Sequence, residues 1–134
     1  MKMWVILMLL AVAMLGALRV EAVVLVGNGD GTVSDNRTGL TWQQGEPGQM
    51  SWGNALSYCV GLTLGGQSDW RLPNVKELRS LVDYTRSGLL INTLLFPNAH
   101  ASLYWSSTTN AYYPHLAWYV HFSYGLVYSY YKLR

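Results

Sequence analysis

A sharp corner followed by a capped helix, at residues 69–82, constrains the fold more than any other stretch of this sequence. Pro73 fixes its own φ and disfavours a helical conformation at Leu72, so the chain must turn there. Asn74 follows as a suitable helix cap, and Glu77 stands three residues later, which is the spacing of a capping box. The stretch therefore predicts a rigid corner that opens directly into a helix.

The helix after this corner is expected to be amphipathic, and another helix is expected before it. Leu78, Leu81 and Val82 recur at the spacing that places apolar side chains on one helical face. Ser51 is a suitable cap for a helix over residues 52–62, whose apolar side chains also share one face. The structural residues expected in this part of the chain are Trp52, Cys59, Trp70, Pro73, Asn74 and Glu77.

Runs rich in β-branched and aromatic residues lie on both sides of the two helices. Gly-rich turns separate them, which favours hairpins. An apolar patch at residues 89–96 is expected to form at most a helical turn. Trp105 and Trp118 are expected in the core. Two helices between groups of strands predict an α+β fold. The predicted strands cover residues 23–26, 32–35, 40–42, 103–108, 117–122 and 126–131.

The N-terminal segment has the features of an export signal. Lys2 supplies a positive start, residues 3–18 are apolar or small, and Val20-Glu21-Ala22 presents small residues to a signal peptidase. We therefore expect a secretory signal at residues 1–22 and an exported domain at 23–134, in the periplasm, on the cell surface or secreted. Cleavage after Ala17 and an uncleaved anchor are the alternatives, although the run is shorter than the roughly 20 residues of a spanning helix.

The charge balance argues against a nucleic-acid partner. The whole chain carries nine Lys and Arg against seven Asp and Glu. Removing residues 1–22 leaves seven against six, a net charge of +1 with His neutral. A nucleic-acid-binding surface needs a basic stripe. We expect no nucleic acid, and no membrane once the signal is removed.

Tyrosines dominate the C-terminal part of the chain, where eight of the ten lie between residues 104 and 131. Tyrosine offers a large contact area, a polar tip and few torsions to freeze, so such a surface suits ligand recognition. The alternative is that half of these rings pack within the sheet. The candidate ligand-binding residues are Tyr112, Tyr113, Tyr119, Tyr124, Tyr128 and Tyr130, with Tyr131 beside them.

Metal and catalytic sites are poorly supported by the sequence. Asn28, Asp30 and Asp35 offer oxygen ligands for calcium, but their spacing departs from the EF-hand pattern, and Asx-stabilised turns explain them as well. The three histidines are not at zinc spacing. The carboxylates form no acid–base pair, and Cys59 has no activating neighbour in sequence. We expect no cofactor, with calcium as the alternative, and no catalytic residue.

Several motifs together resemble a known family. Residues 51–59, Ser-Trp-Gly-Asn-Ala-Leu-Ser-Tyr-Cys, resemble the first helix of the C-type-lectin-like fold. Residues 69–78, Asp-Trp-Arg-Leu-Pro-Asn-Val-Lys-Glu-Leu, resemble the start of the second helix in one branch of that fold. Residues 104–108 and 117–120 resemble its strands. In this order, over about residues 28–132, they resemble the Lcl C-terminal-like domain family, named for a bacterial collagen-like adhesin.

The resemblance implies a fold and a function. It implies a C-type-lectin-like α+β domain, with two helices packed on a small twisted antiparallel sheet with long loops. It also implies a non-catalytic module that binds a glycan or protein ligand in adhesion or surface interaction. The alternatives are an enzyme related to formylglycine-generating enzymes, which use two cysteines, and a truncated domain without independent function.

One departure from the family concerns Cys59. The family usually continues into a last strand with a second cysteine, which resembles the partner of the helix cysteine. Here the sequence stops earlier. We therefore expect a C-terminally truncated domain in which Cys59 is a small buried hydrophobe, a free thiol or an intermolecular partner. A partner chain that completes the sheet or pairs with Cys59 is a further expectation.

Overall fold

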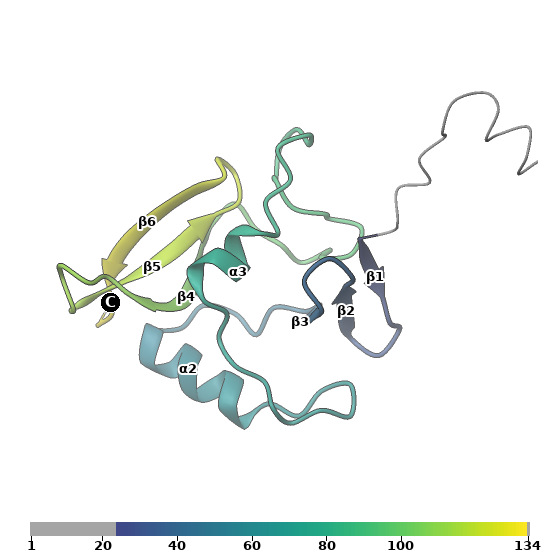
Figure 1. The fold of residues 1–134 in the computed structure, drawn as a ribbon, viewed down its shortest axis with the longest axis horizontal. Coiled ribbons are helices and arrows are strands. Elements are labelled where there is room, and N and C mark those ends of the chain that lie inside the picture. The colour runs from purple at the N-terminus through teal and green to yellow at the C-terminus, as the bar shows by residue number, and fades with distance from the viewer. Residues whose placement is uncertain (1–23, 134) are drawn as a thin grey trace, which may run out of the picture.

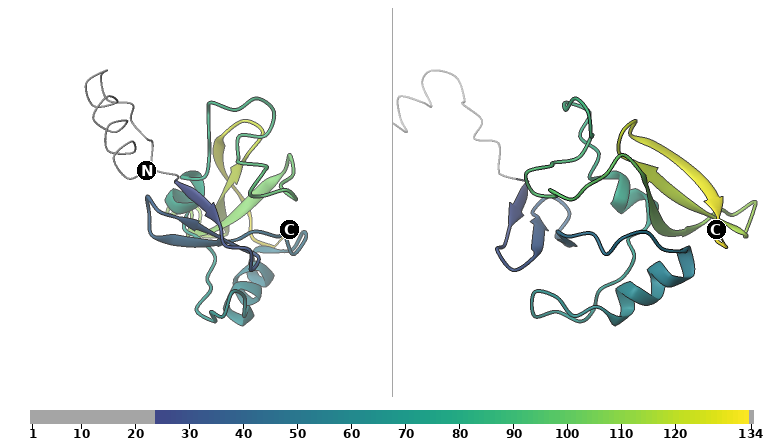
Figure 2. Two further views of the ribbon diagram at one scale, coloured as in Figure 1. Left: turned by 90° about the vertical axis from the view of Figure 1, so that its right-hand side faces the viewer. Right: turned by 180° about the vertical axis from the view of Figure 1, so that it is seen from behind.

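The computed structural model describes residues 24–133 and has an α+β architecture, as the sequence predicts. Two three-stranded antiparallel sheets lie at opposite ends of the molecule, and two helices lie between or beside them (Figures 1 and 2). No helix among residues 24–133 has the length and apolar character that crossing a bilayer requires. The predicted signal at residues 1–22 lies outside the described residues.

The N-terminal sheet consists of β1 (Leu25–Gly27), β2 (Thr32–Asp35) and β3 (Leu40–Gln43) in that order. β2 is the buried strand, because Thr32, Val33 and Asp35 are all nearly inaccessible to solvent. Four residues connect β2 to β3, and the last of them, Gly39, has φ of 74°. That left-handed conformation favours glycine and returns the chain into the hairpin.

The predicted caps start both helices. Ser51 accepts a hydrogen bond from the Asn54 N–H at the start of α2 (Trp52–Gly61). Both hydrogen bonds of the predicted capping box between Asn74 and Glu77 form at the start of α3 (Val75–Arg79). The corner before α3 docks on the second sheet, because the Ser107 N–H donates to the Pro73 carbonyl at 2.8 Å. The corner thus fixes α3 against that sheet.

The C-terminal sheet consists of β4 (Leu103–Thr109), β5 (Leu116–His121) and β6 (Leu126–Tyr131). β5 is central, and its Ala117 and Val120 are fully buried. A bulge shifts the β4–β5 register between Trp105 and Thr109. The β5–β6 hairpin repeats the turn of the first sheet, with four connecting residues and a left-handed glycine, Gly125, in the last position.

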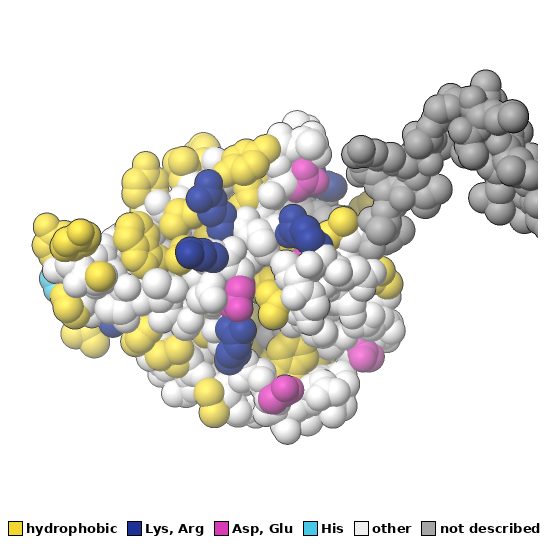
Figure 3. Space-filling view, viewed as in Figure 1, with side chains coloured by type: hydrophobic (Ala, Val, Ile, Leu, Met, Phe, Trp, Pro, Cys, Tyr) yellow, Lys and Arg dark blue, Asp and Glu magenta, His cyan; other side chains and the backbone are white. Residues whose placement is uncertain are grey.

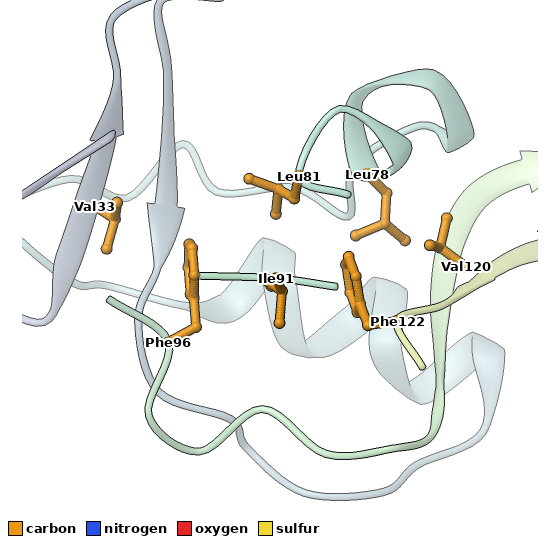
Figure 4. Close-up of a cluster of buried hydrophobic side chains, with 7 residues drawn as sticks. All are labelled: Val33, Leu78, Leu81, Ile91, Phe96, Val120 and Phe122. Carbon is orange, nitrogen blue, oxygen red and sulfur yellow. The ribbon is translucent and has the colours of Figure 1, made fainter. Parts of the chain in front are cut away.

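The hydrophobic core lies between the two sheets and is shown in Figure 4. α3 and the segment after it cover it from one side, and an irregular stretch around residues 89–96 supplies further side chains. Elements far apart in the sequence therefore share one core. Its buried members are Val33, Leu78, Leu81, Ile91, Phe96, Val120 and Phe122.

Two predictions about the fold need correction. The strands form two sheets rather than one, since no described strand joins β3 to the second sheet. The second helix ends at Arg79, because the Ser80 hydroxyl donates to the Glu77 carbonyl and the next amides make tighter i→i+3 bonds. The expected helical turn within residues 89–96 is present, because the Leu95 and Phe96 amides both donate to the Asn92 carbonyl, and Ile91 and Phe96 lie in the core.

Candidate functional site

One face of the C-terminal sheet carries a patch of aromatic and apolar side chains, which we call the aromatic face. The face follows from strand alternation, because residues two apart on a strand point to the same side of the sheet. The opposite side, with Val120 and Val127, packs on the core. Figure 3 shows hydrophobic side chains gathered over the β4–β6 end of the molecule. The aromatic face comprises Leu103, Trp105, Tyr119, His121, Leu126, Tyr128 and Tyr130.

The sheet register arranges these side chains in rows. Trp105 pairs with Tyr119, and Tyr119 pairs with Tyr128, so three rings lie side by side across the strands. The Tyr119 and Tyr128 ring centroids are 6.4 Å apart. Leu103, His121 and Leu126 form the neighbouring row in the same way. Backbone pairing therefore fixes the spacing of the rows across the sheet.

The face grows more exposed from the centre of the sheet to its β6 edge. Tyr119 and Trp105 are half-buried, whereas Tyr128 is 54% exposed and Tyr130 is 40% exposed. The Trp105 indole N–H donates to the Met50 carbonyl at 3.2 Å, which fixes that ring. The outer tyrosines are therefore accessible to solvent, and the inner aromatic residues lie beside them.

The remaining predicted tyrosines flank the hairpin at its two ends. Tyr112 and Tyr113 lie in the β4–β5 connection and are 90% and 58% exposed. Tyr124 lies in the β5–β6 turn, with its ring 5.0 Å from that of His121. The six predicted ligand-binding tyrosines thus divide into a central group, Tyr119, Tyr128 and Tyr130, and two end groups.

One aromatic residue outside the predicted tyrosines, His115, extends the site. The His115 ring stacks on the Tyr131 ring at 5.4 Å and also contacts the Tyr113 ring at 6.1 Å. The Tyr131 ring in turn meets the Tyr130 ring at 6.0 Å. These contacts connect one end group to the central group around the edge of the sheet. The cross-strand register of the folded hairpin places position 131 near position 115.

The site carries no formal charge apart from its histidines. No Asp, Glu, Lys or Arg occurs between residues 103 and 131. Lys132 follows, but its ammonium is engaged by the Pro114 carbonyl, the Thr109 hydroxyl and the Trp52 ring. A surface of rings and hydroxyl groups without charges suits a neutral ligand.

The residues predicted to be structural hold the framework of the site. The Trp52 indole N–H donates to the Ser106 carbonyl at 2.8 Å and joins α2 to β4. The Trp70 N–H bonds to the carbonyls of Leu64 and Gln67. Trp118 is half-buried in β5, and its carbonyl accepts from the Ser106 hydroxyl at 2.7 Å. These tryptophans are therefore engaged by the protein itself.

The metal and catalytic candidates are not brought together. Asn28 and Asp30 bond within the β1–β2 turn, whereas Asp35 lies at the other end of β2 and binds the Arg37 and Thr38 amides. Among residues 24–133, no three His, Cys, Asp or Glu side chains form a group that could hold a metal ion. Burial raises the pKa of the Cys59 thiol, which disfavours a reactive thiolate.

A second polar cluster lies outside the aromatic face. The Glu46 carboxylate accepts a hydrogen bond from the Tyr104 hydroxyl and contacts His100 Nδ1 at 2.8 Å. Burial, together with this carboxylate, raises the pKa of Tyr104 to about 12. The phenol therefore stays protonated at neutral pH and acts as a donor. The cluster ties the loop after β3 to the segment before β4.

Comparison with protein-family models gives one match. The model described as the Lcl C-terminal domain matches residues 31–134, which include every described helix, β2 to β6 and the whole aromatic face. The comparisons with curated proteins and with solved structures found no match. The matched range agrees with the resemblance seen in the sequence.

Proposed function

The chain belongs to the Lcl C-terminal domain family, and from this premise we propose that it is a non-catalytic recognition domain. Its ligand is a neutral glycan or a protein surface, bound through the tyrosines of the aromatic face. The observation that carries the proposal is the row of rings fixed across three strands, with Tyr128 and Tyr130 open to solvent. A role in adhesion or surface interaction follows from the same proposal.

The energetic argument concerns pre-organisation. Binding costs the ordering of side chains, and this cost falls when the rings are already held by backbone pairing. Tyr119 stands between Trp105 and Tyr128 in one row, so its ring has little freedom left to lose. A ligand meeting this face would displace water from rings whose positions change little.

The flanking residues extend the proposed site. Tyr112 and Tyr113 at one end, and Tyr124 at the other, would determine which ligands fit along the hairpin. His115 and Tyr131 link the first end to the centre through ring contacts. We propose these residues as determinants of specificity rather than of affinity.

The finer fold assignment and the location of the protein are also proposals. The order of two capped helices followed by an aromatic sheet supports a C-type-lectin-like fold. The apolar segment at residues 3–18 supports export. The mass of the protein recovered outside the cytoplasm would reveal whether residues 1–22 are removed, and an unprocessed mass would contradict the proposed signal.

A binding experiment with matched variants tests the proposal. The full chain is applied to a glycan array and, separately, to a panel of immobilised surface proteins. Tyr128→Ala should weaken binding by at least about tenfold, as expected for a tyrosine at the centre of an interface. Tyr128→Phe keeps the ring and should weaken binding less.

A control variant excludes a general effect of surface truncation. Leu94 is 86% exposed and lies outside the aromatic face, so Leu94→Ala should bind as the unmodified chain does. Equal binding by the Tyr128→Ala and Leu94→Ala variants would remove the aromatic face as the ligand site. Turnover of a substrate by the purified chain would contradict the non-catalytic assignment.

A further inference from the structure

A large cleft lies between the two sheets and adjoins the aromatic face, since Leu103, Trp105 and Tyr130 line it, whereas Tyr119 and Tyr128 do not. Its volume is about 1500 Å³, which exceeds the roughly 300–1,000 Å³ of small-molecule pockets. Core residues such as Leu81, Ile91 and Phe96 form its floor. Figure 3 shows a hollow beside β3 and below α3, with hydrophobic side chains in it. The size and the apolar floor favour an occupant larger than a metabolite.

One wall of the cleft is the free edge of a strand. The consecutive residues Gly39 to Gln43, which include all of β3, line the cleft. β3 is an edge strand, since its neighbour among the described strands is β2 alone. The Gln44 N–H donates to the Gly31 carbonyl of the β2 side, so alternation turns the backbone groups of Thr41 and Gln43 outward. An edge of this kind is a template for an added strand.

The opposite wall is one face of α2. Ala55, Tyr58 and Cys59, at helical spacing, all line the cleft. Cys59 and Tyr58 are half-buried, and the Tyr58 hydroxyl accepts a hydrogen bond from the Gln43 side chain of β3 at 2.8 Å, which joins the two walls at one point. The helix face predicted to be buried is therefore only partly covered. The cleft thus has a strand edge on one side and an apolar helix face on the other.

The charges around the cleft favour a basic occupant. The charged residues that line it are three carboxylates and one guanidinium, a net charge of −2 with His100 neutral. Arg71 is engaged by Glu77 through two hydrogen bonds of 2.7 and 2.8 Å. Glu46 accepts a hydrogen bond from the Tyr104 hydroxyl and contacts His100 Nδ1. Asp69 is exposed at the rim and makes no ion pair with the described residues. A ligand carrying Lys or Arg would complement the Asp69 carboxylate.

We propose that the cleft binds an extended basic segment of a partner polypeptide, which pairs with the outer edge of β3. Alternate side chains of the segment point to the apolar floor, and a basic residue meets the Asp69 carboxylate at the rim. The four residues of β3 at about 3.3 Å each provide a pairing length of about 13 Å. This mode of binding, strand addition, obtains affinity from main-chain hydrogen bonds and selectivity from alternate side chains.

Synthetic peptides test the proposal with the full chain. The probe is a ten-residue peptide with Val or Leu at alternate positions, Thr between them and Lys at both ends. We expect it to bind, as measured by calorimetry, and to slow alkylation of Cys59 by iodoacetamide. A matched peptide with Glu at both ends should bind more weakly, because the rim is acidic.

Backbone chemistry separates strand pairing from unspecific apolar contact. Methylation of every second backbone nitrogen removes the donors on one edge of the peptide and leaves its side chains unchanged. Methylating the edge that faces β3 should abolish binding, whereas methylating the other edge should not. Binding that is indifferent to both patterns, or that leaves Cys59 alkylation unchanged, would overturn the proposal.

Substitution of the protein gives the complementary evidence. The Thr41 N–H points away from β2, so Thr41→Pro removes one outward donor while the β2–β3 pairing remains. We expect affinity for the peptide to fall by about tenfold. Unfolding by denaturant reports whether the variant still folds. If it does not fold, Asp69→Lys, which changes only the rim charge, provides the test, and unchanged affinity there would contradict the charge argument.

Tyr128 separates the peptide test from the proposed function. Tyr119 and Tyr128 do not line the cleft, whereas three other residues of the aromatic face, Leu103, Trp105 and Tyr130, do. Tyr128→Ala should therefore leave peptide binding unchanged, and Thr41→Pro should leave glycan or protein binding at the aromatic face unchanged. If the peptide fails to bind the unmodified chain while a ligand still binds the aromatic face, the cleft proposal is refuted and the proposed recognition function is unaffected.

Discussion

At the scale of single residues, Gly125 combines two demands that no other residue type satisfies. Its φ of 64° lies in the left-handed region, and an added Cβ would lie 2.6 Å from Tyr84 Cε1. The Tyr84 hydroxyl also donates to the Gly125 carbonyl at 2.9 Å. The β5–β6 hairpin is thereby attached to the segment after α3.

Gly125→Ala is expected to destabilise the protein by about 1–3 kcal/mol, because alanine is strained at this φ and the exposed Tyr84 ring must move aside and lose its hydrogen bond to the residue-125 carbonyl. Gly53 gives a matched control, since it lies in α2 with open space around its Cα. Gly53→Ala should stabilise the protein by about 0.5–1 kcal/mol. Denaturant unfolding measures both changes, and effects of the same sign would contradict the assigned conformations.

Single residues also set the limit of what the sequence could predict about the candidate site. Strand alternation predicts that Tyr128 and Tyr130 lie on the same side of the last strand. It did not reveal that His115 stacks on Tyr131, because that contact depends on the twist of the hairpin and the path of the β4–β5 connection. Local periodicity predicts which side of a strand a ring is on, but not which loop residue it meets.

At the scale of elements, the capping box of α3 makes stability depend on pH. Hydrogen bonds from the Arg71 guanidinium, and then the Asn74 amide, hold the pKa of Glu77 below its ordinary value of 4.5 against the effect of burial. A carboxyl whose pKa is lowered by folding contributes stability above its unfolded pKa. That contribution disappears as the pH falls through the folded pKa.

Glu77→Gln removes the charge and should cost about 1 kcal/mol at neutral pH, within the range of a lost helix cap. The difference from the unmodified chain should shrink as the pH falls below 4.5. Denaturant unfolding at a series of pH values gives both curves. Parallel curves down to the lowest pH would show that Glu77 is not linked to stability.

The elements themselves were largely predictable because their signals are local. Asn74 and Glu77 lie three residues apart, and both four-residue hairpin turns end in glycine. The end of α3 was predicted too late, because Ser80 competes for the Glu77 carbonyl with its hydroxyl. A side-chain hydrogen bond of this kind does not alter hydrophobic periodicity, so the pattern through Val82 still resembled a helix.

At the scale of the whole molecule, the cleft could not be predicted from the sequence. Residues as far apart in the sequence as Gly39 and Tyr130 line the cleft, and no local sequence pattern predicts that such distant residues lie close together. The two-sheet arrangement was not predicted for the same reason. Among the described strands only consecutive strands pair, and no local pattern indicates that β3 and β4 do not. What the sequence did indicate was a helix face at Ala55 and Cys59 that needs a cover, and the structure covers it only in part.

Because α2 is only partly covered, we expect it to unfold locally more easily than the C-terminal sheet does. α2 has one buried residue, Ala55, and its main anchor to the sheet is Trp52 through the Ser106 carbonyl. β5, by contrast, has Ala117 and Val120 at 0% exposure. Regions with few buried contacts open at lower free energy than the core does. We therefore expect α2 amides to exchange hydrogen through local openings and β5 amides through global unfolding.

Trp52→Phe tests this order of opening, because it removes the indole donor and keeps an aromatic ring. Exchange at α2 should accelerate by about tenfold, consistent with a lost buried hydrogen bond, while exchange at β5 changes much less. Leu94→Ala should alter neither. Native-state hydrogen exchange followed by mass spectrometry resolves the two segments. Equal acceleration of exchange in α2 and β5 would mean that the helix and the sheet unfold as one unit. The free energy of opening would then be the same on both sides of the cleft.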